Sequence, residues 1–215
     1  MTNLFREIDE EVRQERFLKL WRVLGPYVIA ATAISVLAVG GYLAWREYQH
    51  RQAEADGARF VAALAEFDAG KPEAAVQSLR RLADEGGAAY RSLAGLRAAG
   101  LRLGAGDVAG AVELYQKIAL DAGAEPIWRD LAQLMTAYAQ FDTAPAASII
   151  ERLRPLTADG GTWRYSAREL SALAKLKAGN PEAAVEFKSL AEDPGAPPSI
   201  RNRAGQMAAA PAITR

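Results

Sequence analysis

Residues 105–112 read Ala-Gly-Asp-Val-Ala-Gly-Ala-Val, and a closely similar octet occurs at residues 69–76 and at residues 178–185. A degenerate copy without the glycine, Phe-Asp-Thr-Ala-Pro-Ala-Ala-Ser, occupies residues 141–148. Successive copies lie about 36 residues apart, which is the period of arrays built from stacked helix pairs. The recurring octet therefore predicts an array of stacked helix pairs.

Each part of the octet has a physical role at the turn between two helices. Gly70, Gly106 and Gly179 suit the left-handed conformation that closes the preceding helix. An Asp or Asn after the glycine can cap the next helix, while Pro72 and Pro181 suit its first turn. A small residue one turn later lets that helix press closely on its partner. We expect this role for the alanines of all four copies, Ala75, Ala111, Ala147 and Ala184.

A second signature recurs half a period away and is predicted to open the first helix of each pair. It reads large apolar residue, Arg, two variable residues, Ala. Its large residues are Tyr90, Trp128, Trp163 and Ile200, and its arginines are Arg91, Arg129, Arg164 and Arg201. The two signatures together predict an all-α fold with about four helix pairs and a C-terminal capping helix. The expected helices are 53–69, 72–85, 88–104, 107–121, 126–140, 144–157, 161–178, 181–192 and 198–209.

An apolar segment precedes the repeats. No charged residue occurs from Val23 to Trp45, a length that spans roughly 35 Å as a helix and exceeds a hydrocarbon core of about 30 Å. Aromatic residues flank both ends, as membrane interfaces favour. Pro26 is expected in the first turn of this helix. The segment is predicted to be a transmembrane helix, with a cleavable signal peptide as the main alternative and a buried core helix as the other.

Basic residues flank the apolar segment unequally. Arg13, Arg16, Lys19 and Arg22 precede it, whereas only Arg46 and Arg51 follow it closely. This excess favours a cytoplasmic N-terminus. The expected domains are a cytoplasmic segment at 1–22, a transmembrane helix at 23–45, the repeat domain at 46–210 and a frayed tail at 211–215. Residues 2–21 are expected to form either a short amphipathic helix or a solvated extension of the anchor.

Composition argues against several classes of function. Lys plus Arg and Asp plus Glu number 26 each, so the basic excess of a nucleic-acid-binding protein is missing. The chain has no cysteine, which excludes disulfides and thiolate chemistry. The single histidine, His50, follows the anchor and has no partner pattern for catalysis or metal binding. We therefore expect a non-enzymatic protein without a cofactor, a metal or a small-molecule substrate.

The second signature allows two interpretations. The aromatic residues Tyr90, Trp128 and Trp163 are expected to fill gaps between stacked helices. The four arginines that follow the large apolar residues would either cover the surface or form a stripe that binds acidic groups of a partner. The sequence leaves both interpretations of the arginines open.

Residues 106–117 resemble the second helix of a tetratricopeptide repeat, because Ala111 matches the small residue and Tyr115 the aromatic residue of that pattern. The first-helix signature departs from the standard form, since Arg follows the aromatic residue directly and the repeat is two residues longer. The array is therefore similar to a divergent tetratricopeptide repeat.

The whole layout resembles the YfgM-like family, the ancillary subunits of the SecYEG translocon. The resemblance rests on the charged N-terminus with Phe5-Arg-Glu-Ile-Asp-Glu-Glu-Val12, on Gly25-Pro26-Tyr27, on the single span and on repeats that open with Trp-Arg. It implies a bacterial inner-membrane protein with a periplasmic array. Its partners would be Sec translocon subunits and a periplasmic chaperone or prolyl isomerase. An adaptor in cell-envelope assembly or division is the alternative, and an anchored enzyme is the alternative of a different class.

Overall fold

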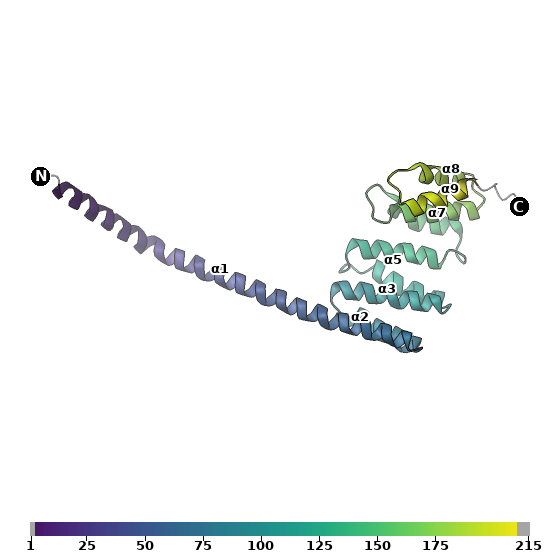
Figure 1. Ribbon diagram of the computed structural model, residues 1–215, viewed down its shortest axis with the longest axis horizontal. Helices are drawn as coiled ribbons and strands as arrows, with labels where there is room; N and C mark the ends of the chain where they lie inside the picture. Colours follow the sequence, from purple (N-terminus) through teal and green to yellow (C-terminus); the bar gives the residue numbers. More distant parts are fainter. Residues whose placement is uncertain (1–2, 210–215) are drawn as a thin grey trace. The chain divides into compact units, whose positions relative to one another are not determined.

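The computed structural model describes the backbone of residues 3–209, and it describes side chains at positions 22, 24, 26 and 27 and from 29 onward. Within these residues the chain is helical and contains no strand (Figure 1). The predicted frayed tail and the side chains of the N-terminal segment lie outside the described residues. The helices are α1 (Asn3–Asp68), α2 (Pro72–Glu85), α3 (Ala88–Gly104), α4 (Val108–Ala119), α5 (Pro126–Ala139), α6 (Ala146–Leu153), the short 3₁₀ helix η1 (Arg154–Thr157), α7 (Arg164–Lys177), α8 (Glu182–Glu192) and α9 (Pro198–Ala209).

The helix α1 is longer than any helix that the sequence pattern predicts. It joins the apolar segment to the first helix of the array without a break. The expectation that Pro26 lies in a first turn is therefore wrong, because this proline stands inside α1. A proline inside a helix removes one backbone hydrogen bond, and α1 continues past this point. The chain divides within α1, between Glu54 and Ala55, into two compact units.

The first unit carries the apolar segment. The stretch of α1 from Ile29 to Asp68 contains a window with a mean hydropathy of 1.4, long and apolar enough to cross a membrane, and that window is not buried by any described residue. Large side chains such as Ile34 and Leu37 are 67% and 75% exposed. Exposed apolar residues of this density are stable only in an apolar environment or against a partner.

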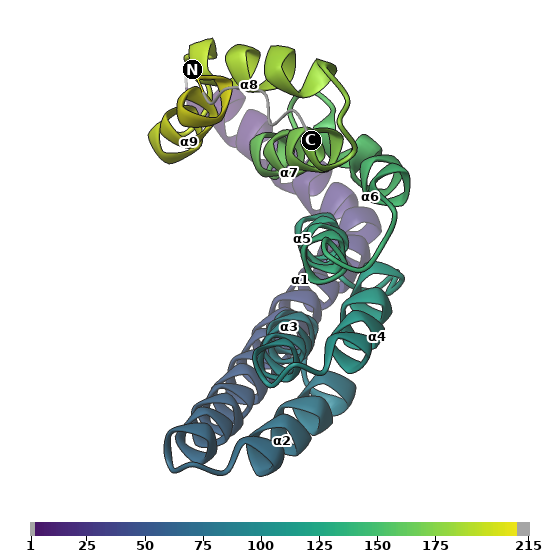
Figure 2. The same cartoon turned by 90° about the vertical axis from the view of Figure 1, so that its right-hand side faces the viewer.

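The second unit is the helical array, and its helices alternate between two layers. Figure 2 shows the first helices of the pairs, α3, α5, α7 and α9, on one side and the second helices, α2, α4, α6 and α8, on the other. The end of α1 is the first helix of the opening pair, because Ala63 is buried together with Ala75 and Leu79 of α2. The all-α array of helix pairs with a terminal helix is thus confirmed.

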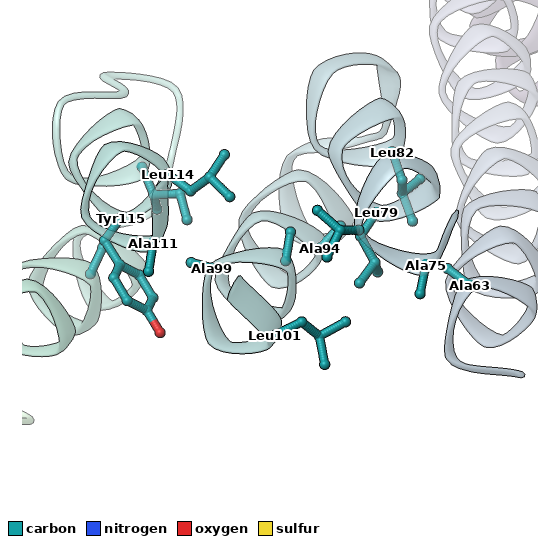
Figure 3. Packing of buried hydrophobic residues seen from close by; sticks show 14 residues of the cluster. Ala63, Ala75, Leu79, Leu82, Ala94, Ala99, Leu101, Ala111, Leu114 and Tyr115 are labelled. Atoms are coloured by element: carbon teal, nitrogen blue, oxygen red, sulfur yellow. The ribbon is translucent and has the colours of Figure 1, made fainter. Parts of the chain in front are cut away.

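Small residues set the spacing of the helices in the array. The alanine that ends the second signature is fully buried in all four copies, at Ala94, Ala132, Ala167 and Ala204. Figure 3 shows Ala63, Ala75, Ala94 and Ala111 between neighbouring helices, with Leu79 and Tyr115 filling the larger spaces. Because alanine adds only a methyl group, the helix backbones approach closely, and a few large residues supply most of the buried apolar area.

The three glycine turns behave as predicted. Gly70, Gly106 and Gly179 have φ angles of 75°, 84° and 70°, in the left-handed region. The backbone N–H of the residue after each glycine closes the turn, as when the N–H of Asp107 donates a hydrogen bond of 2.9 Å to Arg102 O. Asp107 then caps α4, because its carboxylate accepts a hydrogen bond of 2.8 Å from the backbone N–H of Gly110. Left-handed Gly160 closes a turn that the repeat pattern does not predict.

The alanines of the octet do not all occupy the same environment. Ala75 and Ala111 are fully buried, as expected. Ala147 and Ala184 are exposed, so the expectation that they press against a partner helix is wrong for these two. The helices also begin at different positions of the octet: α2 begins at Pro72, whereas α8 begins one position later and α6 two positions later. In α6 and α8, other residues therefore face the core. These are Ile149 in α6 and Ala183 in α8, both 1% exposed.

Candidate protein-binding surface

Large apolar side chains are exposed mainly on the first helices of the array. Leu120 after α4 and Val185 of α8 are the exceptions, at 84% and 71% exposed. Val61 of α1 is 65% exposed, and six others, each 36–41% exposed, come from five first helices. They are Phe67 of α1, Leu93 of α3, Ile127 and Tyr138 of α5, Leu176 of α7 and Met207 of α9. Partly exposed apolar and aromatic residues on a rigid scaffold are the usual anchors of protein interfaces. The layer of first helices is therefore the candidate binding surface.

Charged groups are interspersed with these apolar side chains. The guanidinium of Arg97 on α3 lies 5.8 Å from the centre of the Phe67 ring, across the junction of two first helices. At the end of α7, Lys177 Nζ lies 5.2 Å from the centre of the Phe141 ring and donates hydrogen bonds to the carbonyls of Phe141 and Asp142 at 2.7 and 3.1 Å. The surface thus combines apolar side chains with cations that contact aromatic rings.

An ion pair between a buried carboxylate and a half-exposed guanidinium joins the last two first helices. Glu169 of α7, whose side chain is 8% exposed, accepts two hydrogen bonds of 2.7 Å from Arg203 of α9, whose side chain is 56% exposed. Hydrogen bonding to Glu169 and then its charge raise the pKa of Arg203. Burial raises the pKa of Tyr138, and the negative charge of Glu169 raises it further, while Arg203 partly offsets this effect. The phenol, carboxylate and guanidinium therefore act electrostatically on one another across three helices.

The position of Glu169 in the repeat could have indicated this ion pair from the sequence. Counting from the second signature, Glu169 stands where earlier repeats have Leu96 and Leu134. A carboxylate at a position that is apolar in two other repeats requires a buried partner. In this chain Arg203 supplies it.

The aromatic residues of the second signature connect successive repeats. Tyr90 packs on Phe60 of α1, with 6.2 Å between ring centres, and a Cβ on Gly57 would lie 2.8 Å from its hydroxyl oxygen. Trp163 donates its indole N–H to the carbonyl of Ile127 at 3.0 Å. Trp128 packs against the first core cluster. These contacts place Tyr90 and Trp163 at the junction to the previous pair, and they place Trp128 against the core.

The first two arginines of the signature differ in their contacts. Arg91 is 45% exposed, donates a hydrogen bond of 3.3 Å to Gly86 O and lies 4.0 Å from the carboxylate of Asp121. Arg129 is half-buried, and its guanidinium makes no ion pair or hydrogen bond with any residue whose side chain the structure describes.

The last two arginines are engaged by the fold itself. Arg164 is 21% exposed and contacts Asp159 and Asp193 at 2.8 and 3.3 Å, with Tyr165 Oη at 2.9 Å. Arg201 donates a hydrogen bond of 3.4 Å to the carbonyl of Pro194. The four arginines therefore do not form a uniform stripe of available guanidinium groups, and Arg129 is the one whose guanidinium makes no hydrogen bond or ion pair with a described residue.

Fold and surface together define a class: a curved array of antiparallel helix pairs whose first helices present apolar and charged side chains, as protein-interaction scaffolds do. The model of the tetratricopeptide repeat-like domain matches residues 19–160, about two-thirds of the chain, and the chain belongs to this family. Such a domain suggests a protein-interaction scaffold, and its family is typically non-enzymatic. No curated protein matches the chain.

Proposed function

We propose that this protein is a membrane-anchored scaffold that binds other proteins at the Sec translocon and links it to a periplasmic chaperone or prolyl isomerase. Residues 23–45 would cross the inner membrane of a bacterium, with residues 1–22 in the cytoplasm and the array of residues 46–210 in the periplasm. The continuity of α1 carries the proposal, since one helix contains both the exposed apolar segment and the opening helix of a protein-binding array.

The physical argument for an anchor is the exposed apolar surface between Ile29 and Trp45. In water this surface would favour aggregation, whereas in a bilayer its burial is favourable by about 25 cal/mol per Å². Trp45 and Tyr48 follow the apolar residues, with 6.2 Å between ring centres, and amphipathic rings of this kind prefer the membrane interface. A reporter that is active only in the cytoplasm, fused after residue 215, should be inactive. An active reporter would contradict the proposed orientation.

The partners can be identified by crosslinking in membranes followed by affinity purification of the full-length protein. Recovery of translocon subunits together with a periplasmic chaperone or prolyl isomerase is the expected result. Recovery of only outer-membrane or septal proteins would instead support an adaptor in envelope assembly or cell division, and would contradict the translocon proposal.

Arg129 is the arginine of the second signature to test for partner binding. An Arg129→Ala variant should lower the yield of crosslinked partner while leaving the free energy of unfolding within about 0.5 kcal/mol of the parent, because no described residue depends on its charge. Arg164→Ala is the contrasting variant, since it removes the contacts to Asp159 and Asp193 and should destabilise the array. Unchanged crosslinking by Arg129→Ala would remove this residue from the binding surface.

A further inference from the structure

A cleft of about 590 Å³ lies between two second helices, away from the exposed apolar residues of the first helices. Its walls are α2 and α4, its floor is α3, and Leu120 and Asp121 close one end after α4. The lining mixes the apolar residues Ala83, Leu114 and Ile118 with charged groups on both walls. A concave site of this volume with an apolar floor and a few polar groups is within the range of ligand sites.

The cleft is open because α3 carries small residues on the side that faces α2 and α4. Gly95 lies on the floor, and a Cβ there would come within 3.0 Å of Ile118 and 3.7 Å of Ala83. The equivalent residue of the next repeat is Gln133, and that of the third is Arg168. In the third repeat, Arg168 reaches across to α8 and bonds to Glu186 at 2.7 Å and to Ser189 at 3.1 Å.

A polar group on the floor has no partner. Ser92 is 2% exposed and lines the cleft, and within the described chain its hydroxyl makes no hydrogen bond. The later repeats have Asp130 and Tyr165 at this position. The hydroxyl of Ser92 can donate a hydrogen bond to, or accept one from, a polypeptide backbone that enters the cleft.

The walls also carry one pair of opposite charges that the fold does not neutralise. Lys117 of α4 and Asp84 of α2 form a salt bridge of 2.6 Å. One helical turn before Lys117 lies Glu113, and one turn before Asp84 lies Arg80. Within residues 3–209, Arg80 and Glu113 make no ion pair with each other or with any other group. The cleft therefore offers an acceptor and a donor of opposite charge next to an apolar floor.

We propose that this cleft binds a short extended segment of a partner protein, in which apolar side chains alternate with one acidic and one basic residue. The acidic side chain pairs with Arg80, the basic side chain with Glu113, the apolar side chains cover Leu114 and Ile118, and the backbone bonds to Ser92. From Glu113 to Ala119 the α4 wall extends about 9 Å, the length of about three extended residues, and Leu120 and Asp121 lengthen the cleft beyond α4. The proposal rests on the proposed role as a protein scaffold, but not on the identity of the translocon as partner.

The test uses the full-length protein in detergent micelles and a fluorescein-labelled, C-terminally amidated peptide of sequence Glu-Leu-Lys-Leu. Fluorescence anisotropy should show saturable binding. The dissociation constant should rise about fivefold or more in an Arg80→Gln, Glu113→Gln double variant and about threefold in Ser92→Ala. Arg152→Gln on α6 is the matched surface control and should not change it. Circular dichroism checks that each variant keeps its helix content.

Two control peptides separate the contribution of the charges to peptide binding from that of the apolar side chains. Gln-Leu-Gln-Leu lacks the charges and Glu-Gly-Lys-Gly lacks the apolar side chains, so both should bind more weakly than the parent peptide. Equal binding of either peptide, or an undiminished affinity in both the double variant and Ser92→Ala, would overturn the proposal. So would a change of oligomeric state in the Arg80→Gln, Glu113→Gln variant, because it would assign the cleft to a second copy of the chain. Failure of this test with translocon crosslinks intact would leave the proposed function standing.

Discussion

The indole N–H of Trp163 donates a hydrogen bond of 3.0 Å to the backbone carbonyl of Ile127, which lies 36 residues earlier in the chain. The separation equals one repeat, so the bond connects the same end of two successive first helices. Lys177 makes a similar connection at the other end, to the carbonyl of Phe141, again across 36 residues. The two bonds tie both ends of α7 to the repeat that contains α5, each across one full period of the sequence.

Replacing Trp163 by Phe should destabilise the array by about 1 kcal/mol more than the same replacement at Trp128. Both changes remove a similar apolar area, but only the first leaves the Ile127 carbonyl without its donor. Urea denaturation of the full-length protein in detergent, followed by circular dichroism, measures the difference. Equal losses at the two positions would show that the bond contributes nothing to stability.

Gly106 and Gly104 form a matched pair for backbone conformation. Gly106 has a φ of 84°, whereas Gly104 ends α3 without a positive φ, and a Cβ would meet no atom within 4 Å at either site. Gly106→Ala should therefore lower the free energy of unfolding by about 1 kcal/mol, because a Cβ is strained in the left-handed region. Gly104→Ala should raise it by about 0.5 kcal/mol. Thermal or chemical unfolding distinguishes the two signs, and a loss at both sites would argue against the assigned cause.

The ion pair between Glu169 and Arg203 should respond asymmetrically to substitution. Arg203→Leu alone should cost about 2 kcal/mol, because it leaves a buried carboxylate without its partner, with a discount for the exposure of the guanidinium. The double variant Glu169→Leu, Arg203→Leu should be close to the parent in stability, since leucine already occupies the equivalent position in two repeats. A double-mutant cycle measures the coupling, and additive losses would contradict it.

Acid should weaken the α3–α4 turn through Asp107. The hydrogen bond from the Gly110 N–H, and then the contact with Arg102, hold the pKa of Asp107 below its ordinary value of 3.8. A carboxyl group whose pKa is lower in the folded state stabilises the fold above pH 3.8, and this contribution is lost as the pH falls through the folded pKa. An Asp107→Asn variant should therefore lose less stability than the parent protein between pH 5 and strongly acidic pH.

The measurement for this prediction is the free energy of unfolding as a function of pH, for parent and variant. Asp68→Asn, on an exposed residue at the end of α1, is the matched control and should follow the parent curve. If the Asp107→Asn curve runs parallel to the parent curve down to acidic pH, the cap does not contribute to the acid sensitivity.

Local and periodic features of this protein could be read from the sequence, because they depend on neighbouring residues. The glycine turns, the helix limits of the array from Pro72 onward and the burial of the signature alanines follow from conformational preference and period, and the structure bears out the all-helical array. The junction of the anchor with the array was not predicted, since the polar residues between Trp45 and Ala55 carry no signal that distinguishes a linker from a continuing helix.

Tertiary structure alone decided the features that depend on contacts between repeats. The packing of α6 and α8 leaves Ala147 and Ala184 exposed, and Asp159 and Asp193 pair with Arg164, which the sequence places in the candidate stripe. The opening of the cleft above Gly95 likewise needs three helices to be in place. The period of the sequence specifies an all-helical array of stacked pairs, because each turn and helix start depends on residues that are close together in the chain. Which side chains the array leaves available was decided only when stacked helices buried some charges and left others unpaired.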